Sequence, residues 1–370
     1  MNRFVQNVIL KMYNFYSTKL TVSCESLKKN VEFFKSKISK NTQILAIIKA
    51  NAYGYGDIQI AERLIQNGIN YFAVADFEEG VNLRKNGIKS PIMILYPGIN
   101  NLNIILEHCL EPTIYSKNML DEIIKISKSK IKIHIKVDTG MNRYGIKENE
   151  LLTVISKLKE EKNIILGSIF SHMSSNKTEH QDFSIQQMSC FNRIKKLLTD
   201  NLDYKIDTHI LSSFGALNFP DHSDTIVRIG FGLYNGIFKK TCSQIGELST
   251  QIAQIKCIKP NESVGYNLGF VSTKEMKIAI LPIGYADGLQ RSWGNGKLRF
   301  LYNKTFVPVI GQISMDSCIV DVTQIQNAKE GDSLILFGKN RSIFELSKEL
   351  HTIPYEITAG LSRRIHRIFI

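Results

Sequence analysis

Residues 43–75 read QILAIIKANAYGYGDIQIAERLIQNGINYFAVA and contain one complete unit of the pattern that decides the fold. An apolar run at 43–48 is followed by a Gly-rich turn, a stretch at 58–67 with helical spacing of apolar residues, and a second apolar run at 71–75. Gly68 ends the helical stretch, where glycine is favoured because it adopts the left-handed backbone conformation. The segment therefore predicts a strand, a helix and a second strand.

The same unit recurs along the first two thirds of the chain. Its apolar runs span residues 43–48, 71–75, 91–95, 111–114, 131–137, 164–171, 205–211 and 225–229. The helical stretches between them include residues 58–67, 78–86, 116–129, 149–159 and 184–199, and Gly87 marks a second helix end. Alternating strands and helices imply a parallel sheet, and eight such units favour a closed (β/α)8 TIM-type barrel over an open sheet.

After Gly236 the pattern changes to short β-type runs divided by turn residues. The runs span residues 277–282, 307–309, 318–322 and 333–337, with turns at 294–296 and 330–332. We therefore predict an α/β chain with a second, mainly β domain. The expected divisions are an N-terminal extension over 1–18, the barrel over 19–236 and the β domain over 237–370.

Length and composition are those of a globular protein. The chain has 370 residues, of which 43% are hydrophobic and 22% charged, so each domain can bury its own core. No apolar run approaches the ~18 residues of a membrane span, and the run at 8–10 is too short for a secretory signal. We expect a soluble, cytoplasmic protein that does not enter a membrane.

Cysteine, histidine and charge patterns exclude several other classes. The six cysteines form no CxxC pair and the eight histidines form no HExxH motif, so we expect reduced thiols and no metal site. The net charge of +13 raises the possibility of nucleic-acid binding. The lysines nevertheless lie on helix-patterned stretches without interleaved aromatic residues, which favours solvated helix faces and a field that attracts small anions.

Charged and polar side chains follow the predicted barrel strands where those strands end. They are Lys49, Asp138, Arg143, His172, Ser213 and Arg228. In a TIM-type barrel the active site lies at the carboxyl ends of the strands, so these groups should converge. Several cations gathered at one place indicate a bound anion, because uncompensated charge is expensive to bury.

Lys49 has two interpretations on the residues alone. It follows an apolar run and precedes a Gly/Asn-rich turn, so its amine could be dehydrated and available as a nucleophile for Schiff-base chemistry. It could equally be a surface lysine that extends its ammonium into water.

Several motifs resemble those of the alanine racemase family, in the family's order, from Lys19 to the C-terminus. They are AIIKANAYGYG at 46–56, KVDTGMNRYG at 136–145, SHMSSN at 171–176, RIGFGLYNG at 228–236, VGYN at 264–267, PIGYADG at 282–288, QISMD at 312–316 and YE at 355–356. The resemblance implies a pyridoxal 5'-phosphate-dependent isomerase that interconverts L-alanine and D-alanine and supplies D-alanine for peptidoglycan.

Two acid/base residues are implied by the same resemblance, because racemisation removes a proton from one face of a carbon and returns it to the other. Lys49 would carry the cofactor and serve one face, and Tyr266 would serve the other. A tyrosine with a pKa near 10 needs nearby positive charge or a hydrogen-bond relay, which His172 and Arg228 would supply. Arg228 would also face the pyridine nitrogen, and its alternative role is a strand-end salt bridge.

The remaining roles come from the family as well. The phosphate would be bound by Tyr53, Ser213, Tyr355 and the backbone of Gly230 and Phe231. The substrate carboxylate would be held by Arg143 and the backbone at Met315, with Tyr285 at the entrance. Lys136 occupies a position often carbamylated in the family, where it would pair with Arg143. Tyr355 could instead be a core aromatic residue, and Lys136 could simply be neutralised by Asp138.

The family also implies a head-to-tail homodimer in which Tyr266 and Met315 act on the partner's barrel. The chain departs from the family at Ser212-Ser213 (usually Asn-Ser), at Ile229 (usually Pro) and at Gln312 (often Arg). Substrate preference is therefore open, and a serine or broad-specificity racemase is the alternative. A related decarboxylase is disfavoured by VGYN and Met315-Asp316, and a cofactor-carrying homeostasis protein, which lacks the β domain, is disfavoured by that domain. A nucleic-acid-binding protein is the weakest alternative, because it rests only on the net charge.

Overall fold

The computed structural model describes residues 15–175, 177–219, 222, 224–236 and 242–370, which form two compact units. The barrel unit comprises residues 30–52 and the described part of 57–233. The β unit comprises residues 15–29, 53–56 and the described part of 234–370. The predicted N-terminal extension over 1–18 lies outside the described residues for its first 14 positions.

The barrel unit contains an eight-stranded sheet in which all neighbours pair in parallel, in the order β8-β7-β6-β5-β4-β3-β2-β9. Its strands are β2 (Gln43–Ile47), β3 (Phe72–Val74), β4 (Ile92–Ile94), β5 (Glu111–Ile114), β6 (Ile131–Lys136), β7 (Ile164–Phe170), β8 (Asp207–His209) and β9 (Ile226–Ile229). A parallel bridge between Ser212 and Arg228 links the ends of the sheet. The predicted TIM-type fold is confirmed, and each strand falls within its predicted run.

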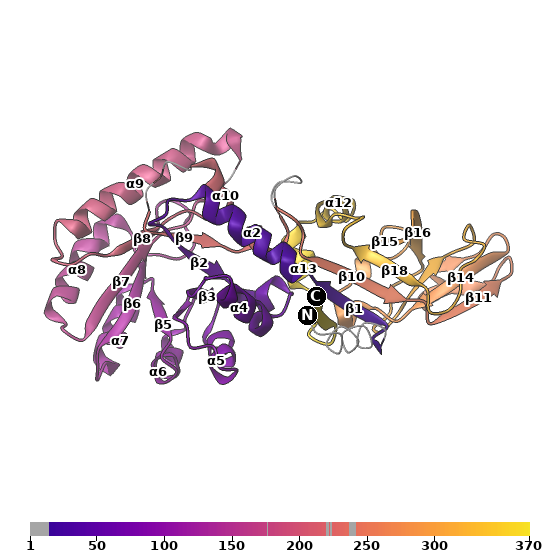
Figure 1. Cartoon of the computed structure of the whole chain (residues 1–370), viewed down its shortest axis with the longest axis horizontal. Coiled ribbons are helices and arrows are strands. Elements are labelled where there is room, and N and C mark those ends of the chain that lie inside the picture. Colours follow the sequence, from indigo (N-terminus) through magenta and orange to yellow (C-terminus); the bar gives the residue numbers. More distant parts are fainter. Residues whose placement is uncertain (1–14, 176, 220–221, 223, 237–241) are drawn as a thin grey trace. The chain divides into compact units, whose positions relative to one another are not determined.

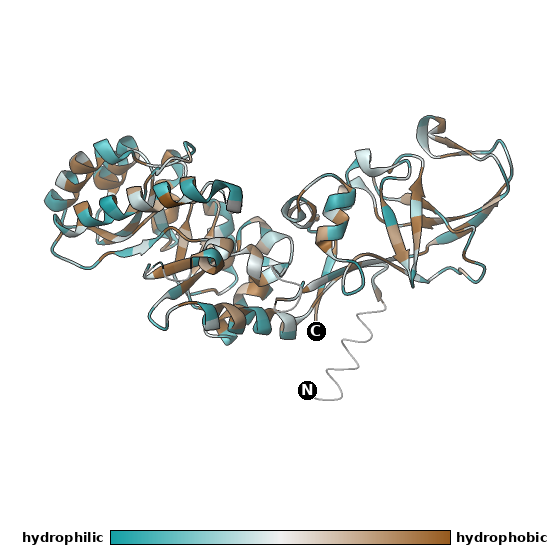
Figure 2. Ribbon diagram, turned by 90° about the horizontal axis from the view of Figure 1, so that it is seen from above, coloured by the Kyte–Doolittle hydropathy of each residue, from teal (hydrophilic) through white to brown (hydrophobic). Residues whose placement is uncertain are grey.

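Helical segments lie between these strands along the chain, and the longer ones lie outside the sheet (Figure 1). They are α2 (Cys24–Lys37), α3 (Lys49–Tyr53), α4 (Asp57–Gln66), α5 (Phe77–Lys85), α6 (Leu102–Glu107), α7 (Lys117–Ile126), α8 (Leu151–Glu160), α9 (Gln181–Thr199), α10 (Ser213–Asn218) and α11 (Phe231–Tyr234). In α7, Met119, Leu120 and Ile123 recur at helical spacing and are buried. The resulting two-sided helices show as bands of teal and brown in Figure 2.

The β unit is built on a nine-stranded sheet in the order β11-β14-β17-β16-β15-β18-β10-β1-β19. The strands are β1 (Thr18–Val22), β10 (Gly246–Gln251), β11 (Gln254–Ile258), β14 (Met276–Leu281), β15 (Arg299–Tyr302), β16 (Thr305–Ile310), β17 (Cys318–Asp321), β18 (Ser333–Phe337) and β19 (His366–Phe369). A two-stranded sheet of β12 (Ser263–Val264) and β13 (Phe270–Val271), with helices α12 (Ile343–Glu349) and α13 (Pro354–Ala359), completes the unit. A mainly β second domain is confirmed.

The predicted start of the barrel at Lys19 differs from the structure. Strand β1 pairs antiparallel with β10, with Thr18 opposite Thr250, and parallel with β19. By its local sequence, β1 resembles a barrel strand, because it is a short apolar strand of five residues followed by a helix. Its pairing partners, β10 and β19, are distant in the sequence. The second boundary lies at Tyr234, close to the predicted 236.

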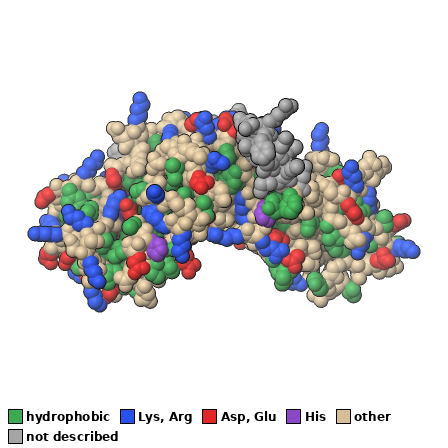
Figure 3. All heavy atoms as spheres, turned by 60° about the horizontal axis from the view of Figure 1, so that its bottom comes forward, with side chains coloured by type: hydrophobic (Ala, Val, Ile, Leu, Met, Phe, Trp, Pro, Cys, Tyr) green, Lys and Arg blue, Asp and Glu red, His purple; other side chains and the backbone are tan. Residues whose placement is uncertain are grey.

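The surface carries both signs of charge. On the face seen in Figure 3, Lys and Arg side chains are interspersed with Asp and Glu. Within the described chain, no helix combines the length and apolar character that crossing a membrane requires.

Candidate active site

Lys49 lies two residues after the end of β2 and begins a short left-handed turn. Ala50, Asn51, Ala52 and Tyr53 have φ angles of 52, 55, 50 and 56°. Such a conformation costs roughly 1–2 kcal/mol for each residue other than glycine, so the surrounding structure must hold it in place. The backbone immediately after Lys49 therefore has one defined conformation.

Glu79 of α5 holds this turn. Its Oε1 accepts a hydrogen bond from the backbone N–H of Ala50 at 2.5 Å, and its Oε2 accepts one from Ala75 at 2.7 Å. Asn51 adds a bond through its Oδ1, which accepts from the N–H of Asp57 at 3.1 Å. One carboxylate therefore ties the ends of β2 and β3 together beside Lys49.

Three cationic groups gather around the ring of Tyr96, which follows β4. The Nζ of Lys136 lies 4.9 Å from the ring centre, and the Nζ of Lys49 and the guanidinium carbon of Arg143 lie 5.9 Å from it. Arg143 also donates to the Tyr96 hydroxyl at 3.3 Å. Within the described residues, neither lysine makes an ion pair or a hydrogen bond through its ammonium. The negative face of an aromatic ring partly compensates such charges.

Both lysine amines are made less basic by their surroundings. Burial, followed by the charge of Arg143, lowers the pKa of Lys49. Burial, followed by the charges of Arg228, Arg143 and Lys49, lowers the pKa of Lys136 to about 7. An amine with a lowered pKa is more often uncharged near neutral pH and can then act as a nucleophile. Between the two interpretations of Lys49, this geometry supports the nucleophile.

Arg228 of β9 is buried and donates to five acceptors. Its Nη1 donates to Nδ1 of His209 at 2.8 Å and to the His209 carbonyl at 2.9 Å. Its Nη2 donates to the carbonyls of Ser171 and Ile210, at 2.6 and 3.0 Å, and to Nδ1 of His172 at 3.1 Å. These partners are carbonyls and imidazoles, so among the described residues Arg228 does not form the strand-end salt bridge.

The contact with Arg228 defines the protonation of His172. Arginine can only donate, so Nδ1 of His172 must accept, and a neutral ring then carries its proton on Nε2. Burial and then the charge of Arg228 lower the pKa of His172, so the neutral form prevails. His172 therefore presents an N–H donor on the side of its ring away from Arg228.

Ser213, at the first turn of α10, is surrounded by backbone donors. Its hydroxyl oxygen accepts from the N–H of Gly230 at 3.1 Å and from that of Gly232 at 3.3 Å. Two of the predicted phosphate-binding residues are thus brought together, and Gly232 joins them. Backbone N–H groups converging beside a hydroxyl are the donors that a phosphate requires.

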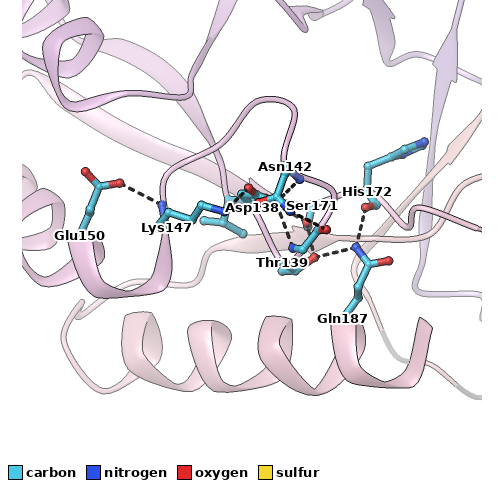
Figure 4. A network of polar contacts seen from close by, with 10 residues as sticks. Asp138, Thr139, Asn142, Lys147, Glu150, Ser171, His172 and Gln187 are labelled. Carbon is cyan, nitrogen blue, oxygen red and sulfur yellow. Dashed lines mark hydrogen bonds and ion pairs between the residues drawn. The ribbon is translucent and has the colours of Figure 1, made fainter. Parts of the chain in front are cut away.

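The loop after β6 is held by Asp138 (Figure 4). Its Oδ1 accepts from the N–H groups of Gly140 and Asn142, both at 3.0 Å, and its Oδ2 pairs with Lys147 at 2.6 Å. The Asp138 carboxylate is therefore bound by Lys147 and the loop backbone. The amine of Lys136 lies against the aromatic rings instead. The same loop carries Arg143.

Gln187 of α9 braces the neighbouring loop after β7. Its Nε2 donates to the Thr139 hydroxyl at 3.3 Å and to the His172 carbonyl at 3.2 Å, and its Oε1 accepts from Ser174 at 2.9 Å. The His172 imidazole points away from this network in Figure 4. The backbone of His172 is thus held on one side, which leaves its ring for the site.

The other predicted site residues belong to the β unit. Tyr355 lies with its ring 6.1 Å from that of Tyr53, which in turn lies 5.3 Å from Tyr234. Burial raises the pKa of Tyr355 to about 12, so it remains a phenol donor. A second group forms where the Tyr285 N–H donates to the Ser314 carbonyl and the Ala286 N–H donates to the Met315 carbonyl, both at 3.0 Å.

Tyr266 follows β12 and is 67% exposed, and Leu268 and Met315 are 69% and 53% exposed. Exposed aromatic and apolar side chains of this size, gathered in one unit, indicate a surface that is used for contact.

Sequence reasoning missed several residues of this arrangement, among them Glu79, Tyr96, His209 and Gly232. Tyr96 directly follows the predicted apolar run at 91–95 and lies two residues after β4, so the rule that selected the ends of other strands would also have selected it. Glu79 and His209 carry no local signal, because their importance lies in contacts with residues far along the chain.

A phosphorylated aldehyde fits these residues. The cations Lys49, Lys136, Arg143 and Arg228 have no carboxylate in ion-pair contact within the described residues, and the burial of Lys136 and Arg228 favours a compensating anion. Ser213 and its backbone neighbours match a phosphate, and the amine of Lys49 matches an aldehyde.

Comparison with known proteins agrees with this chemistry. Residues 22–237 match the N-terminal domain of alanine racemase and residues 245–369 match its C-terminal domain. The chain is 33% identical to alanine racemase from Helicobacter pylori strain P12, over 94% of this chain and 98% of that protein.

Solved structures are similar over nearly the whole chain. One is alanine racemase from Bacillus anthracis with bound L-Ala-P, with a TM-score of 0.90, 28% identity and 96% of each chain covered. Another is alanine racemase from Bartonella henselae with covalently bound pyridoxal phosphate, with a TM-score of 0.85, 26% identity, and 96% of this chain and 100% of that chain covered.

Proposed function

The chain belongs to the alanine racemase family, and on that premise we propose how its own residues interconvert L-alanine and D-alanine with pyridoxal 5'-phosphate. When bound, the cofactor withdraws electrons from the substrate α-carbon and makes its proton removable. The assignment of the site rests on the amine of Lys49. Its pKa is lowered, and three further cations surround it.

Lys49 has two roles in this proposal. Its amine would hold the cofactor covalently, and the free amine would move a proton on one face of the substrate. The lowered pKa supports both roles, because only the uncharged amine can attack a carbonyl or accept a proton. Glu79 supports them indirectly by fixing the backbone immediately after Lys49.

Tyr266 is proposed as the acid/base group on the opposite face. A phenol serves as a base at neutral pH only if a donor or a positive charge stabilises its anion. His172 offers such a donor, because Arg228 directs its proton to Nε2. Arg228 remains protonated, and its guanidinium would face the pyridine nitrogen of the cofactor, where it would keep that nitrogen unprotonated and disfavour transamination.

The anionic groups of the cofactor and substrate are assigned to the remaining residues. Ser213 and the backbone of Gly230 and Phe231, with the phenols of Tyr53 and Tyr355, would bind the phosphate. Arg143 and the backbone at Met315 would hold the substrate carboxylate, and Tyr285 would line the entrance. Lys136 would carry a carbamate whose negative charge pairs with Arg143, which its pKa of about 7 supports.

We further propose a homodimer in which the β unit of one subunit supplies Tyr266 and Met315 to the barrel of the other. The exposure of Tyr266, Leu268 and Met315 supports an interface in this region. The family's role is to supply D-alanine for peptidoglycan, and we therefore propose that this protein acts in the bacterial cytoplasm.

Borohydride reduction followed by peptide mass mapping tests the central assignment. A pyridoxyl group should appear on the peptide that contains Lys49 and should be absent from Lys49→Ala. A chiral assay with L-alanine and L-serine then decides the substrate, and we expect faster turnover of alanine. Racemase activity without a group on Lys49 would contradict the proposal.

A further inference from the structure

A chain of buried hydrogen bonds crosses the interior of the barrel unit and ends on Arg228. Nδ1 of His209 meets the Arg228 guanidinium at 2.8 Å, and Nε2 of His209 meets the Ser168 hydroxyl at 2.9 Å. Ser168 meets Nδ1 of His134 at 2.7 Å, and Nε2 of His134 meets a carboxylate oxygen of Glu111 at 2.9 Å. The members come from four neighbouring strands and β9, so the sheet itself sets their spacing.

The two ends of this chain determine the direction of every bond in it. Arginine can only donate and an ionised carboxylate can only accept. Arg228 therefore makes Nδ1 of His209 an acceptor, and His209 donates through Nε2 to Ser168. The Ser168 hydroxyl then donates to His134, which donates through its own Nε2 to Glu111. Each imidazole is thereby held in a single tautomer.

The charge states agree with this direction. Burial lowers the pKa of His134 and, together with the charge of Arg228, that of His209, so both rings stay neutral. Burial alone would raise the pKa of Glu111, but the His134 hydrogen bond and the charge of Lys132 outweigh it and lower the pKa to about 2. Glu111 is therefore an anion at neutral pH.

Packing holds the same groups in place. The ring of Phe170 stacks on that of His209, with centroids 4.8 Å apart and an interplanar angle of 1°. The Arg228 guanidinium lies 5.4 Å from the centre of the same Phe170 ring. At the other end, the Tyr71 hydroxyl donates to Glu111 at 2.8 Å. His134, Ser168 and His209 are fully buried, so water does not compete for their bonds.

We propose that Glu111, His134 and Ser168 are positioning residues for the racemase reaction, and that they act by fixing the tautomer of His209 and through it the orientation of Arg228. With the chain intact, His209 can only accept from Arg228. If the chain reverses, His209 presents an N–H to the guanidinium, and two donors face each other. Arg228 would then turn from the position that the proposed function, on which this inference rests, assigns to it.

Histidine nitrogen NMR on the purified holoenzyme tests this directly. In the wild type, His209 should show a protonated Nε2 and an unprotonated Nδ1. In Glu111→Gln the side-chain amide can both donate and accept, so this end of the hydrogen-bond chain no longer sets its direction. Ser168→Ala removes the middle hydrogen-bonding group. Each variant should change the nitrogen chemical shifts of His209 or give a mixture of tautomers. In each, kcat should fall about tenfold, equivalent to about 1.36 kcal/mol, and KM should change little.

Two variants serve as controls. Glu122→Gln makes the same chemical change on the exposed side of α7 and should leave spectra and kcat unchanged. Ser168→Thr keeps the hydroxyl and should retain the wild-type His209 signals. Unchanged His209 signals in both Glu111→Gln and Ser168→Ala would overturn the proposal, because Arg228 alone would then suffice. The NMR result does not depend on turnover, so it is distinguishable from a failure to find the cofactor on Lys49.

Discussion

Lys136 is buried, and its ammonium nitrogen lies 4.9 Å from the centre of the Tyr96 ring, near which Lys49 and Arg143 also lie. Burial is the main cause that lowers the pKa of Lys136, and repulsion from the charges of Arg228, Arg143 and Lys49 adds to it. The consequence is an amine with a pKa of about 7, far below the usual 10.5 of lysine.

This low pKa predicts that Lys136 forms a carbamate. Only the uncharged amine reacts with CO2, forming a carbamate and releasing a proton, so occupancy should rise as the pH increases through about 7. Carbon NMR with labelled bicarbonate should show one carbamate signal that Lys136→Gln lacks. Lys132→Gln, which changes an exposed lysine on the same strand, is the control. Absence of the signal well above pH 7 would contradict the prediction.

Glu79→Gln should destabilise the protein by about 1–3 kcal/mol, because the new amide N–H₂ would face a backbone N–H of Ala50 or Ala75 instead of accepting from it. The free energy of unfolding from urea titration measures this. The neighbouring Glu78 is exposed, so Glu78→Gln should change the free energy of unfolding by no more than about 0.5 kcal/mol. Equal effects of the two variants would show that the carboxylate does not hold the turn.

Tyr266→Phe should abolish α-proton exchange for one enantiomer of alanine and leave the other, because each face of the substrate has its own acid/base group. The loss should be about 10²–10⁴-fold in the affected direction. Exchange into deuterated water, followed separately from L- and D-alanine, measures it. Tyr302→Phe, whose hydroxyl bonds Asp332 in the β unit, should behave as the wild type. Equal loss in both directions would indicate structural damage.

Leu268→Asp should weaken the proposed dimer, because a charge would replace an apolar side chain that is 69% exposed in the subunit. Sedimentation should show more monomer, and activity should fall with dilution. Leu152→Asp makes the same change at a 61% exposed position of α8 and should leave the assembly intact. A wild-type protein that sediments as a fully active monomer would rule the dimer out.

Glu111 should make stability depend on acid pH. Its pKa falls from 4.5 when unfolded to about 2 when folded, so its contribution is present above pH 4.5 and is lost as the pH falls toward 2. The shift corresponds to about 3 kcal/mol. The difference in unfolding free energy between wild type and Glu111→Gln should therefore be largest at neutral pH and shrink toward about pH 3. A difference that stays constant would contradict the lowered pKa.

The fold could be predicted because its pattern is local. Each barrel strand is a short apolar run and most of the helices repeat apolar residues at helical spacing, so strands such as β2 and β9 appear within their predicted ranges. Strand β1 could not be assigned to its sheet in this way. Its pairing with β10 joins residues at opposite ends of the chain, and nothing near Thr18 identifies Thr250 as its partner.

The site divides in the same manner. Lys49, His172 and Arg228 stand at strand ends, so topology alone predicted that they converge, as they do around Tyr96 and His209. The left-handed turn after Lys49 had no such signal. Ala50 and Ala52 do not favour positive φ, and the turn depends on a carboxylate from another helix.

By itself, the sequence determined the order of strands and helices, the two domains and the identity of the chemical groups at the strand ends, because hydrophobic period and side-chain chemistry are written residue by residue. Only the tertiary structure decided the pKa of Lys136, the tautomers of His172 and His209, and the bracing by Glu79 and Glu111. Those properties arise from burial and from hydrogen bonds between residues distant in the chain, and they exist only once the strands lie side by side.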